Sequence, residues 1–181
     1  MVIRKLYRIE SAHIVQNAIS KRCSHSYHGH SGVIEVFFKT TGLDKAGMVY
    51  DFGAMKNTVG SFLDMFDHSV HLADTATDED VKFFTERNDR WIKLPVNPTA
   101  ENYAVLFRDC INDILRNSEF TNEEGFVHCS GVRYHETATG YAESDSSDKK
   151  LYCLTDITFS PGTWEEASDK IKEIYSKYGN K

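Results

Sequence analysis

Long apolar runs are missing from this sequence of 181 residues. No stretch approaches the roughly 20 apolar residues that a membrane-spanning helix needs. The opening "MVIRKLYRIESAHIV" also lacks the uninterrupted apolar core of a signal peptide. Excess positive charge is missing too, because 21 Lys and Arg residues face 27 Asp and Glu residues and the net charge is -6. We therefore expect a cytoplasmic protein whose partners include neither a membrane nor nucleic acid.

Paired cysteines are absent as well. The four cysteines, Cys23, Cys110, Cys129 and Cys153, are scattered and form no C-x-x-C pair, so each is expected to be a free thiol. No internal repeat divides the chain. With 40% hydrophobic residues, a chain of this length buries a sizeable core without disulfides. We predict one domain over residues 1–181.

The sequence does contain clear strand and helix patterns. Strands are predicted over residues 2–13, where apolar and polar residues alternate loosely, over residues 31–42, which are rich in β-branched and aromatic residues, and in two halves of residues 125–145. Helical spacing predicts helices over residues 52–66 and 98–117, with Asp51 and Thr99 as N-caps. Residues 71–97 are charged and irregular. A strand over residues 151–159 and a helix from Pro161 or Thr163 to about Gly179 complete an α+β pattern.

Three histidines fall where the first two predicted strands meet. His28 and His30 flank Gly29, and a spacing of two on a strand places both imidazoles on one face. His13 ends the preceding strand, so pairing of the two strands would add a third ring nitrogen. Three neutral imidazoles leave one coordination position of a zinc ion open, as catalytic zinc sites do. The alternative is a polar strand edge without a metal.

Cys23 lies five residues before His28, on the loop that leads to these histidines. A thiol near a divalent cation has a lowered pKa and is available as a ligand or as a base. The alternative is a packed, inert cysteine, which is our interpretation of Cys110, Cys129 and Cys153.

Two further segments supply candidate site residues. "FDHSVHL" places Asp67 beside His68, a pair typical of an oriented imidazole that moves protons near neutral pH. Solvated side chains at a helix end are the alternative. "YHETATGYAE" places Glu136 in a strand, where a carboxylate can accept two hydrogen bonds from the edge of a guanidine-like ring. A turn residue before Thr137 is the alternative there.

Six segments of the chain then follow one another in a recognisable order. They are "SAH", Cys23 followed by "HGH", "GMVYDFGAMK", "DH", "PTAEN" and the strand glutamate of "VRYHETATGYAE". In this order they resemble the family of 6-pyruvoyltetrahydropterin synthase and 6-carboxytetrahydropterin synthase. The resemblance covers a core of about residues 3–143 and leaves a C-terminal extension of about residues 145–181. Residues 72–95 are longer than in the compact members of the family.

The resemblance implies the tunnelling fold, an antiparallel sheet with two helices on one face. Trimers of such subunits close into a barrel and stack in pairs as a homo-hexamer, with active sites between subunits. The implied roles are zinc ligands for His13, His28 and His30, general base for Cys23, proton relay for Asp67 and His68, and pterin anchor for Glu136. Under these roles, Cys23 and Glu136 of different chains could serve one pocket.

The implied substrate is a pterin triphosphate, 7,8-dihydroneopterin triphosphate. The loop "CSHSYHGH" and the segment "GMVYDF" are closer to the bacterial branch of the family, which forms 6-carboxytetrahydropterin, acetaldehyde and triphosphate on the route to queuosine and other 7-deazapurines. Lys21, Arg22 and Lys56 are the cations nearest in sequence for the triphosphate. His25, inside the loop, is expected to be solvated.

Two alternatives to this function remain open. One is the pyruvoyl-forming activity, which uses the same residues and eliminates triphosphate without cleaving the side chain. The other is a zinc-stabilised binding module without chemistry. A structural zinc site is usually rich in cysteine and fully coordinated, whereas three histidines leave a vacancy.

Overall fold

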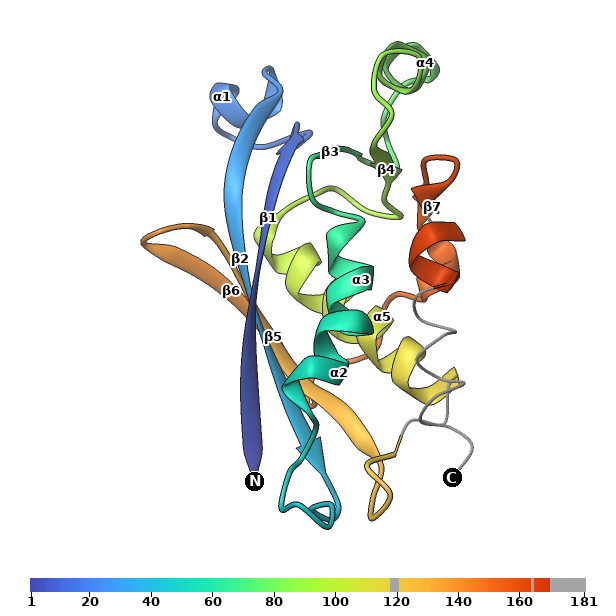
Figure 1. Cartoon of the computed structure of the whole chain (residues 1–181). Helices are drawn as coiled ribbons and strands as arrows, with labels where there is room; N and C mark the ends of the chain where they lie inside the picture. Colours follow the sequence, from blue (N-terminus) through green and yellow to red (C-terminus); the bar gives the residue numbers. More distant parts are fainter. Residues whose placement is uncertain (118–120, 164, 170–181) are drawn as a thin grey trace.

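The chain folds around one mixed sheet of seven strands. The architecture is that of a computed structural model, which describes residues 1–117, 121–163 and 165–169. In sheet order the strands are β6 (Gly140–Asp145), β5 (Val127–Thr137), β2 (His28–Thr40), β1 (Val2–His13), β3 (Ser69–Leu72), β4 (Trp91–Lys93) and β7 (Thr158–Phe159). The long strands β1, β2, β5 and β6 form antiparallel pairs and curve across Figure 1.

The two longest strands, β1 and β2, pair as an antiparallel hairpin in the middle of the sheet. In this register His13 lies opposite His28, and Ser11 lies opposite His30. Side chains alternate between the two faces of a strand, and directly opposed residues share a face. The hairpin therefore places all three histidines on the same face of the sheet, as their spacing predicted.

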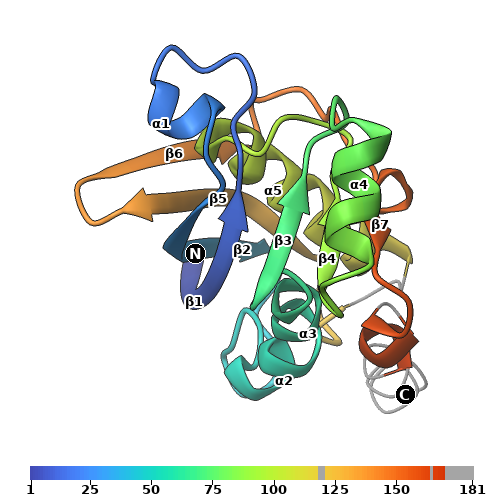
Figure 2. The ribbon, with the colours of Figure 1, turned by 90° about the horizontal axis from the view of Figure 1, so that it is seen from above.

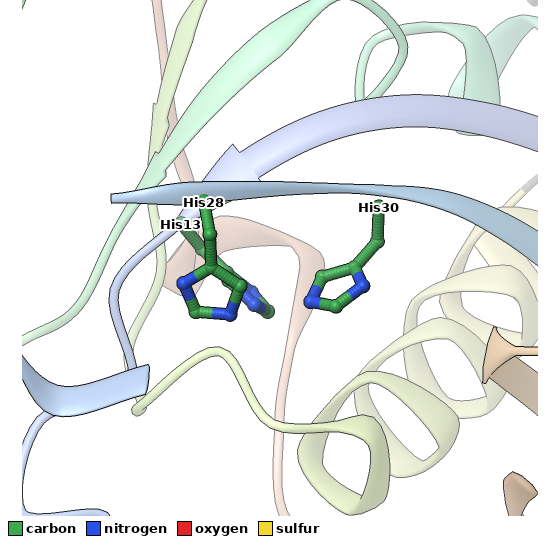
Figure 3. Close-up of side chains that lie close together, drawn as sticks. All are labelled: His13, His28 and His30. Carbon is green, nitrogen blue, oxygen red and sulfur yellow. The ribbon is translucent and has the colours of Figure 1, made fainter. Parts of the chain in front are cut away.

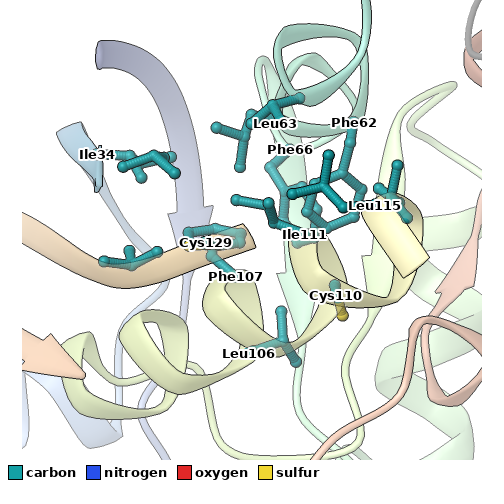
Figure 4. Close-up of a cluster of buried hydrophobic side chains, with 14 of the residues drawn as sticks. Ile34, Phe62, Leu63, Phe66, Leu106, Phe107, Cys110, Ile111, Leu115 and Cys129 are labelled. Carbon is teal, nitrogen blue, oxygen red and sulfur yellow. The ribbon is translucent and has the colours of Figure 1, made fainter. Parts of the chain in front are cut away.

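Helices cover that same face of the sheet. α2 (Phe52–Asn57), α3 (Val59–Asp64) and α5 (Ala100–Asn117) lie on one side of the long strands (Figures 1 and 2). Between the layers, Phe62 and Phe66 meet Phe107 and Ile111 of α5 in a core that also contains Ile34 of β2 (Figure 4). All five side chains are buried. The predicted α+β class is confirmed.

The single helix predicted over residues 52–66 is interrupted at Thr58. Asp51 is the N-cap, as predicted, because its carboxylate accepts hydrogen bonds from the backbone N–H groups of Gly53 at 2.7 Å and Ala54 at 2.9 Å. Thr58 departs from helical geometry at φ -96° and ψ -84°. Its buried hydroxyl donates to the Ala54 carbonyl at 3.1 Å and lies 2.5 Å from the hydroxyl of Tyr50. Local hydroxyl bonds of this kind compete with helix continuation.

Residues 71–97, which the sequence presented as irregular, contain regular structure. β3 pairs with β1, and β4 pairs with β3, both in parallel. Between them lies α4 (Asp78–Thr85), whose N-cap Thr77 accepts a hydrogen bond from the backbone of Asp80. α4 and the short helix α1 (Lys21–Ser24) project beyond the same end of the sheet (Figure 1).

The C-terminal extension differs from its prediction. Instead of a strand over residues 151–159, the chain forms a 3₁₀ helix (Leu154–Asp156) and the short strand β7. The backbone N–H groups of Leu151 and Tyr152 donate to the carboxylate of Asp109, which replaces strand pairing there. Residues 165–169 are helical, and the rest of the predicted terminal helix lies outside the described residues. No helix in the described part of the chain is long and apolar enough to cross a membrane.

Candidate metal and active site

Three histidines of the hairpin form a cluster. One ring nitrogen each of His13, His28 and His30 lies within 4.8 Å of the others, and Figure 3 shows the three rings gathered on one side of the strands. The ring centroids are 4.7 to 5.1 Å apart, in edge-to-face arrangements. Zinc–nitrogen bonds of about 2.0 to 2.1 Å put ligand nitrogens about 3 to 4 Å apart. Small side-chain rotations therefore suffice to close this cluster on one ion.

Three buried ring nitrogens of the cluster lack hydrogen-bond partners in the described part of the chain, which is consistent with a bound metal. Both ring nitrogens of His13 and Nε2 of His30 are buried without a hydrogen-bond partner among the described residues. Nδ1 of His28 lies 2.9 Å from the carbonyl oxygen of Ser26, so Nδ1 carries the proton and Nε2 keeps its lone pair. Each unpaired buried polar group costs about 1 to 3 kcal/mol. A metal ion would remove part of that cost, so the residues present fit one.

The protonation state of His13 also suits a metal ligand. Its pKa is lowered to about 3, first by burial and then by the neighbouring His28, His30 and His71. The ring is therefore neutral near pH 7, and the neutral imidazole is the form that coordinates metals.

A buried pair of polar side chains lies behind His13. Nδ1 of His71 is 2.5 Å from the hydroxyl of Tyr103, whose ring is nearly parallel to that of His13 at 6.3 Å between centroids. Nε2 of His71 meets the Ser69 hydroxyl at 2.8 Å and the Phe66 carbonyl at 3.2 Å. The sequence analysis assigns no role to His71, and it misses Tyr103. The available signal was a tyrosine on the apolar side of a helix, since a buried phenol needs a partner.

Glu136, at the end of β5, lies beside the cluster. Its Oε1 atom is 3.6 Å from Nε2 of His13 and 3.9 Å from Nε2 of His30. The side chain is 29% exposed, so it borders both the histidines and solvent. A ligand bound at the histidines would therefore meet this carboxylate in the same chain.

Asp67 and His68 form the predicted pair just before β3. Nδ1 of His68 is 2.8 Å from Oδ2 of Asp67. The other carboxylate oxygen accepts a hydrogen bond from the Glu10 N–H at 2.6 Å, and the His68 N–H donates to the Glu10 carbonyl at 2.6 Å. These bonds hold His68 at φ 52°, a left-handed conformation that is uncommon outside glycine. The imidazole is thus oriented by its neighbour, while its side chain is 73% exposed.

An open groove of about 500 Å³ runs past this pair, and its lining includes His68 and, of the three clustered histidines, His30 alone. Gly29 and Ser31 contribute the β2 wall of the groove. A larger pocket of about 710 Å³ is lined by α5 and by residues between 150 and 165, and none of the predicted site residues lines it.

Cys23 lies on α1 and is half-buried. Within the described residues its thiol forms no hydrogen bond, and it is not part of the histidine cluster. The structure thus brings the three histidines together with Glu136, and Asp67 together with His68, but among the described residues no hydrogen bond joins Cys23 to either group.

The other residues of the loop and the predicted cations lie on the surface. His25 is exposed, as expected, with its ring 2.8 Å from the hydroxyl of Ser24. Lys21 and Arg22 are exposed on α1. Lys56 lies instead in a groove with Lys5 and Arg8 of β1. The three predicted cations therefore do not form one group.

Comparison with known proteins places these residues in context. The sequence matches a family model described as "6-pyruvoyl tetrahydropterin synthase" over residues 2–147. The 6-carboxy-5,6,7,8-tetrahydropterin synthase of Helicobacter pylori strain J99 is 42% identical over 176 residues, which cover 94% of this chain and 88% of the relative. The synthase of the same name from Aquifex aeolicus is 31% identical over 158 residues, covering 78% of this chain and 95% of the relative.

Solved structures share the fold at lower sequence identity. An uncharacterized protein from Wolinella succinogenes has a TM-score of 0.59 at 17% identity, covering 81% of this chain and 98% of that chain. The 6-pyruvoyl tetrahydropterin synthase of Caenorhabditis elegans has a TM-score of 0.52 at 21% identity, covering 81% of this chain and 95% of that chain. These similarities confirm the predicted tunnelling fold.

Proposed function

Because the chain belongs to the 6-pyruvoyl tetrahydropterin synthase family, we propose that it is a zinc-dependent 6-carboxytetrahydropterin synthase. It converts 7,8-dihydroneopterin triphosphate and water to 6-carboxy-5,6,7,8-tetrahydropterin, acetaldehyde and triphosphate, on the route to queuosine and other 7-deazapurines. The observation that carries the proposal is the cluster of three histidines beside the carboxylate of Glu136. The carboxy-forming branch is supported by the names of the Helicobacter pylori and Aquifex aeolicus relatives.

The three histidines hold the metal, and zinc suits them because three neutral nitrogen ligands with an open position are typical of catalytic zinc. When bound, zinc supplies a Lewis acid that lowers the pKa of groups next to the oxygens it polarises. The carbonyl of Ser26 fixes the tautomer of His28, so this ligand is already oriented for binding.

The chain's own residues move the protons. Cys23, as a thiolate, takes a carbon-bound proton of the substrate side chain, and His68, oriented by Asp67, returns a proton. Within the described part of one chain, no hydrogen bond joins Cys23 to the Asp67 and His68 pair. The proposal therefore includes the homo-hexamer that the family resemblance implies, in which neighbouring chains supply these groups to a shared site.

Glu136 binds the pterin ring. Its two carboxylate oxygens accept hydrogen bonds from the 2-amino group and the adjacent ring N–H, in the bidentate pattern that a carboxylate forms with a guanidine-like edge. Its position beside His13 and His30 lets one ligand reach both the carboxylate and the metal ligands.

A second candidate is the formation of 6-pyruvoyltetrahydropterin, which the description of the matching family model favours. It uses the same residues and stops before carbon–carbon cleavage. The test is to incubate the zinc-loaded protein with 7,8-dihydroneopterin triphosphate, without a reductase, and to identify the products by mass spectrometry. 6-Carboxytetrahydropterin with equimolar acetaldehyde supports the proposal. Pyruvoyl product without acetaldehyde selects the alternative, and unchanged substrate contradicts both.

The metal is tested separately by elemental analysis of the purified protein. We expect about one zinc per chain, and its loss in His28→Ala. His25→Ala is the matched control, because His25 lies on the same loop but is exposed and bonded to Ser24. Full zinc occupancy in His28→Ala, or equal loss in both variants, would contradict the assignment of the ligands.

A further inference from the structure

The loop between β1 and β2 carries Cys23, yet it has few contacts of its own. Its helix α1 spans four residues and buries none of them. A backbone hydrogen bond from Val15 to the carbonyl of Cys23, at 2.9 Å, closes the loop on itself. The position of Cys23 relative to the sheet therefore depends on contacts that other segments make with the loop.

The first such contact is made by Asn97, near the start of α5. Its side-chain amide pairs with the backbone of Gln16 in both directions, accepting from the N–H at 3.1 Å and donating to the carbonyl at 2.7 Å. The Thr75 hydroxyl also donates to the side chain of Gln16. Asn97 is itself fixed to the helix, because its carbonyl accepts a hydrogen bond from the Asn102 side chain at 2.9 Å. The start of the loop is thereby attached to the core.

The second contact comes from α4. The ring of Phe84 packs on the ring of Tyr27, at 4.2 Å between centroids. Tyr27 is the residue that precedes β2, so it marks the end of the loop. The end of the loop is thereby attached to residues 72–95.

The other residues of α4 are not packed into the hydrophobic core. None of its residues is buried. The neighbouring Phe83 is 48% exposed and is covered by the guanidinium of Arg87, at 4.4 Å from its ring centroid. The rings of Phe83 and Phe84 pack on each other at 5.0 Å between centroids, and of these two rings it is that of Phe84 that contacts the Cys23 loop in the described residues.

We propose that α4 and the segment that leads into α5 position the Cys23 loop, with Phe84 and Asn97 as the positioning residues. Asn97 fixes the loop where it leaves β1, and Phe84 fixes it where it enters β2. The catalytic consequence rests on the proposed role of Cys23 as a base. A base must lie within hydrogen-bond reach of the proton that it takes, and a displacement of about 1 Å can cost about 100-fold in rate.

The test compares Phe84→Ala with Phe83→Ala in a Cys153→Ser background, because Cys153 is exposed in the structure and not packed as predicted. There are three readouts. The first is the rate at which iodoacetamide alkylates Cys23, measured by peptide mass spectrometry. The second is the zinc content, and the third is the pair of kinetic constants kcat and KM. For Phe84→Ala we expect alkylation to rise several-fold and kcat to fall by about 10- to 100-fold, with zinc content and KM unchanged. Phe83→Ala should match the parent protein in every readout.

A double-mutant cycle identifies the ring contact as the cause. Tyr27→Ala should reproduce the effects of Phe84→Ala, and the double variant should add little, because coupled residues give non-additive effects. Tyr27→Phe and Phe84→Tyr keep both rings and should restore the parent values. Alkylation and kcat of Phe84→Ala equal to those of Phe83→Ala would overturn the proposal, as would fully additive effects in the cycle.

Alkylation also separates this proposal from the proposed function. It reports the exposure of Cys23 whether or not Cys23 is the base. If Cys23→Ala keeps its turnover, the proposed function is wrong about the base, while a raised alkylation rate in Phe84→Ala still supports positioning of the loop by α4.

Discussion

Acid is expected to destabilise the fold through His71. This imidazole is fully buried, and burial lowers its pKa from 6.5 to about 4. The unfolded chain takes up the proton near pH 6.5, so between pH 6.5 and 4 it binds more protons than the folded chain. The free energy of unfolding therefore rises with pH in this window. The contribution of neutral His71 is complete above pH 6.5 and is lost as the pH falls through about 4.

The size of the effect follows from the two pKa values. At about 1.4 kcal/mol for each pH unit, the whole window corresponds to about 3 kcal/mol, of which about 2 kcal/mol is lost between pH 7 and pH 5. The assay is urea denaturation of metal-free protein, followed by circular dichroism at pH 7, 6 and 5. Metal-free protein avoids competition between protons and metal at His13.

The comparison variant is His71→Asn, which keeps an acceptor for the Tyr103 hydroxyl but does not titrate. Carboxylates and His13 titrate in both proteins, so the difference between the two pH profiles isolates His71. The wild type should lose about 2 kcal/mol more than the variant between pH 7 and pH 5. Parallel profiles would refute the reasoning, because His71 would then have the same pKa in both states.

Three substitutions test the site and the packing around it. Cys23→Ala should keep zinc and fold while kcat falls by about 10²- to 10⁴-fold; loss of zinc would make the thiol a ligand. Glu136→Gln should weaken pterin binding by roughly 1 to 3 kcal/mol at unchanged zinc content, whereas Glu143→Gln on β6 should bind normally; equal affinities in a titration would place the ring elsewhere. Gly32→Ala should lower the free energy of unfolding by about 1 to 3 kcal/mol, because its Cβ atom would lie 2.6 Å from the Tyr134 hydroxyl. A wild-type urea midpoint for that variant would show that Tyr134 moves aside freely.

The elements with long, regular patterns could be predicted from the sequence. Alternation or helical spacing of apolar residues can be recognised in β1, β2 and α5, because each of these elements is long enough. The clustering of the three histidines could be predicted for the same reason, because a spacing of two on a strand determines the face on which His28 and His30 lie. The family resemblance supplied the roles of Asp67, His68 and Glu136, and these remain predictions.

The sequence could not reveal elements that depend on partners distant in the chain. β3 and β4 are 4 and 3 residues long, too short for a period to show, and they form by pairing with β1 and with each other. Residues 151–159 have a sequence typical of a strand. Their first two backbone N–H groups, however, donate hydrogen bonds to the carboxylate of Asp109 on α5. The pairing of His71 with Tyr103 was hidden for the same reason, because their separation along the chain is 32 residues.

The register of the β1–β2 hairpin has a consequence for how the site forms. All three candidate ligands lie between His13 and His30, on strands that pair with each other. Contacts between segments close in the chain form with a small loss of entropy, and antiparallel hairpins form in about 1 to 10 μs. Glu136 and the Asp67 and His68 pair join only when distant segments dock. During folding, the three histidines can therefore come together before Glu136 and the Asp67 and His68 pair dock, and an ion bound at that stage would stabilise the strands on which the rest of the sheet assembles.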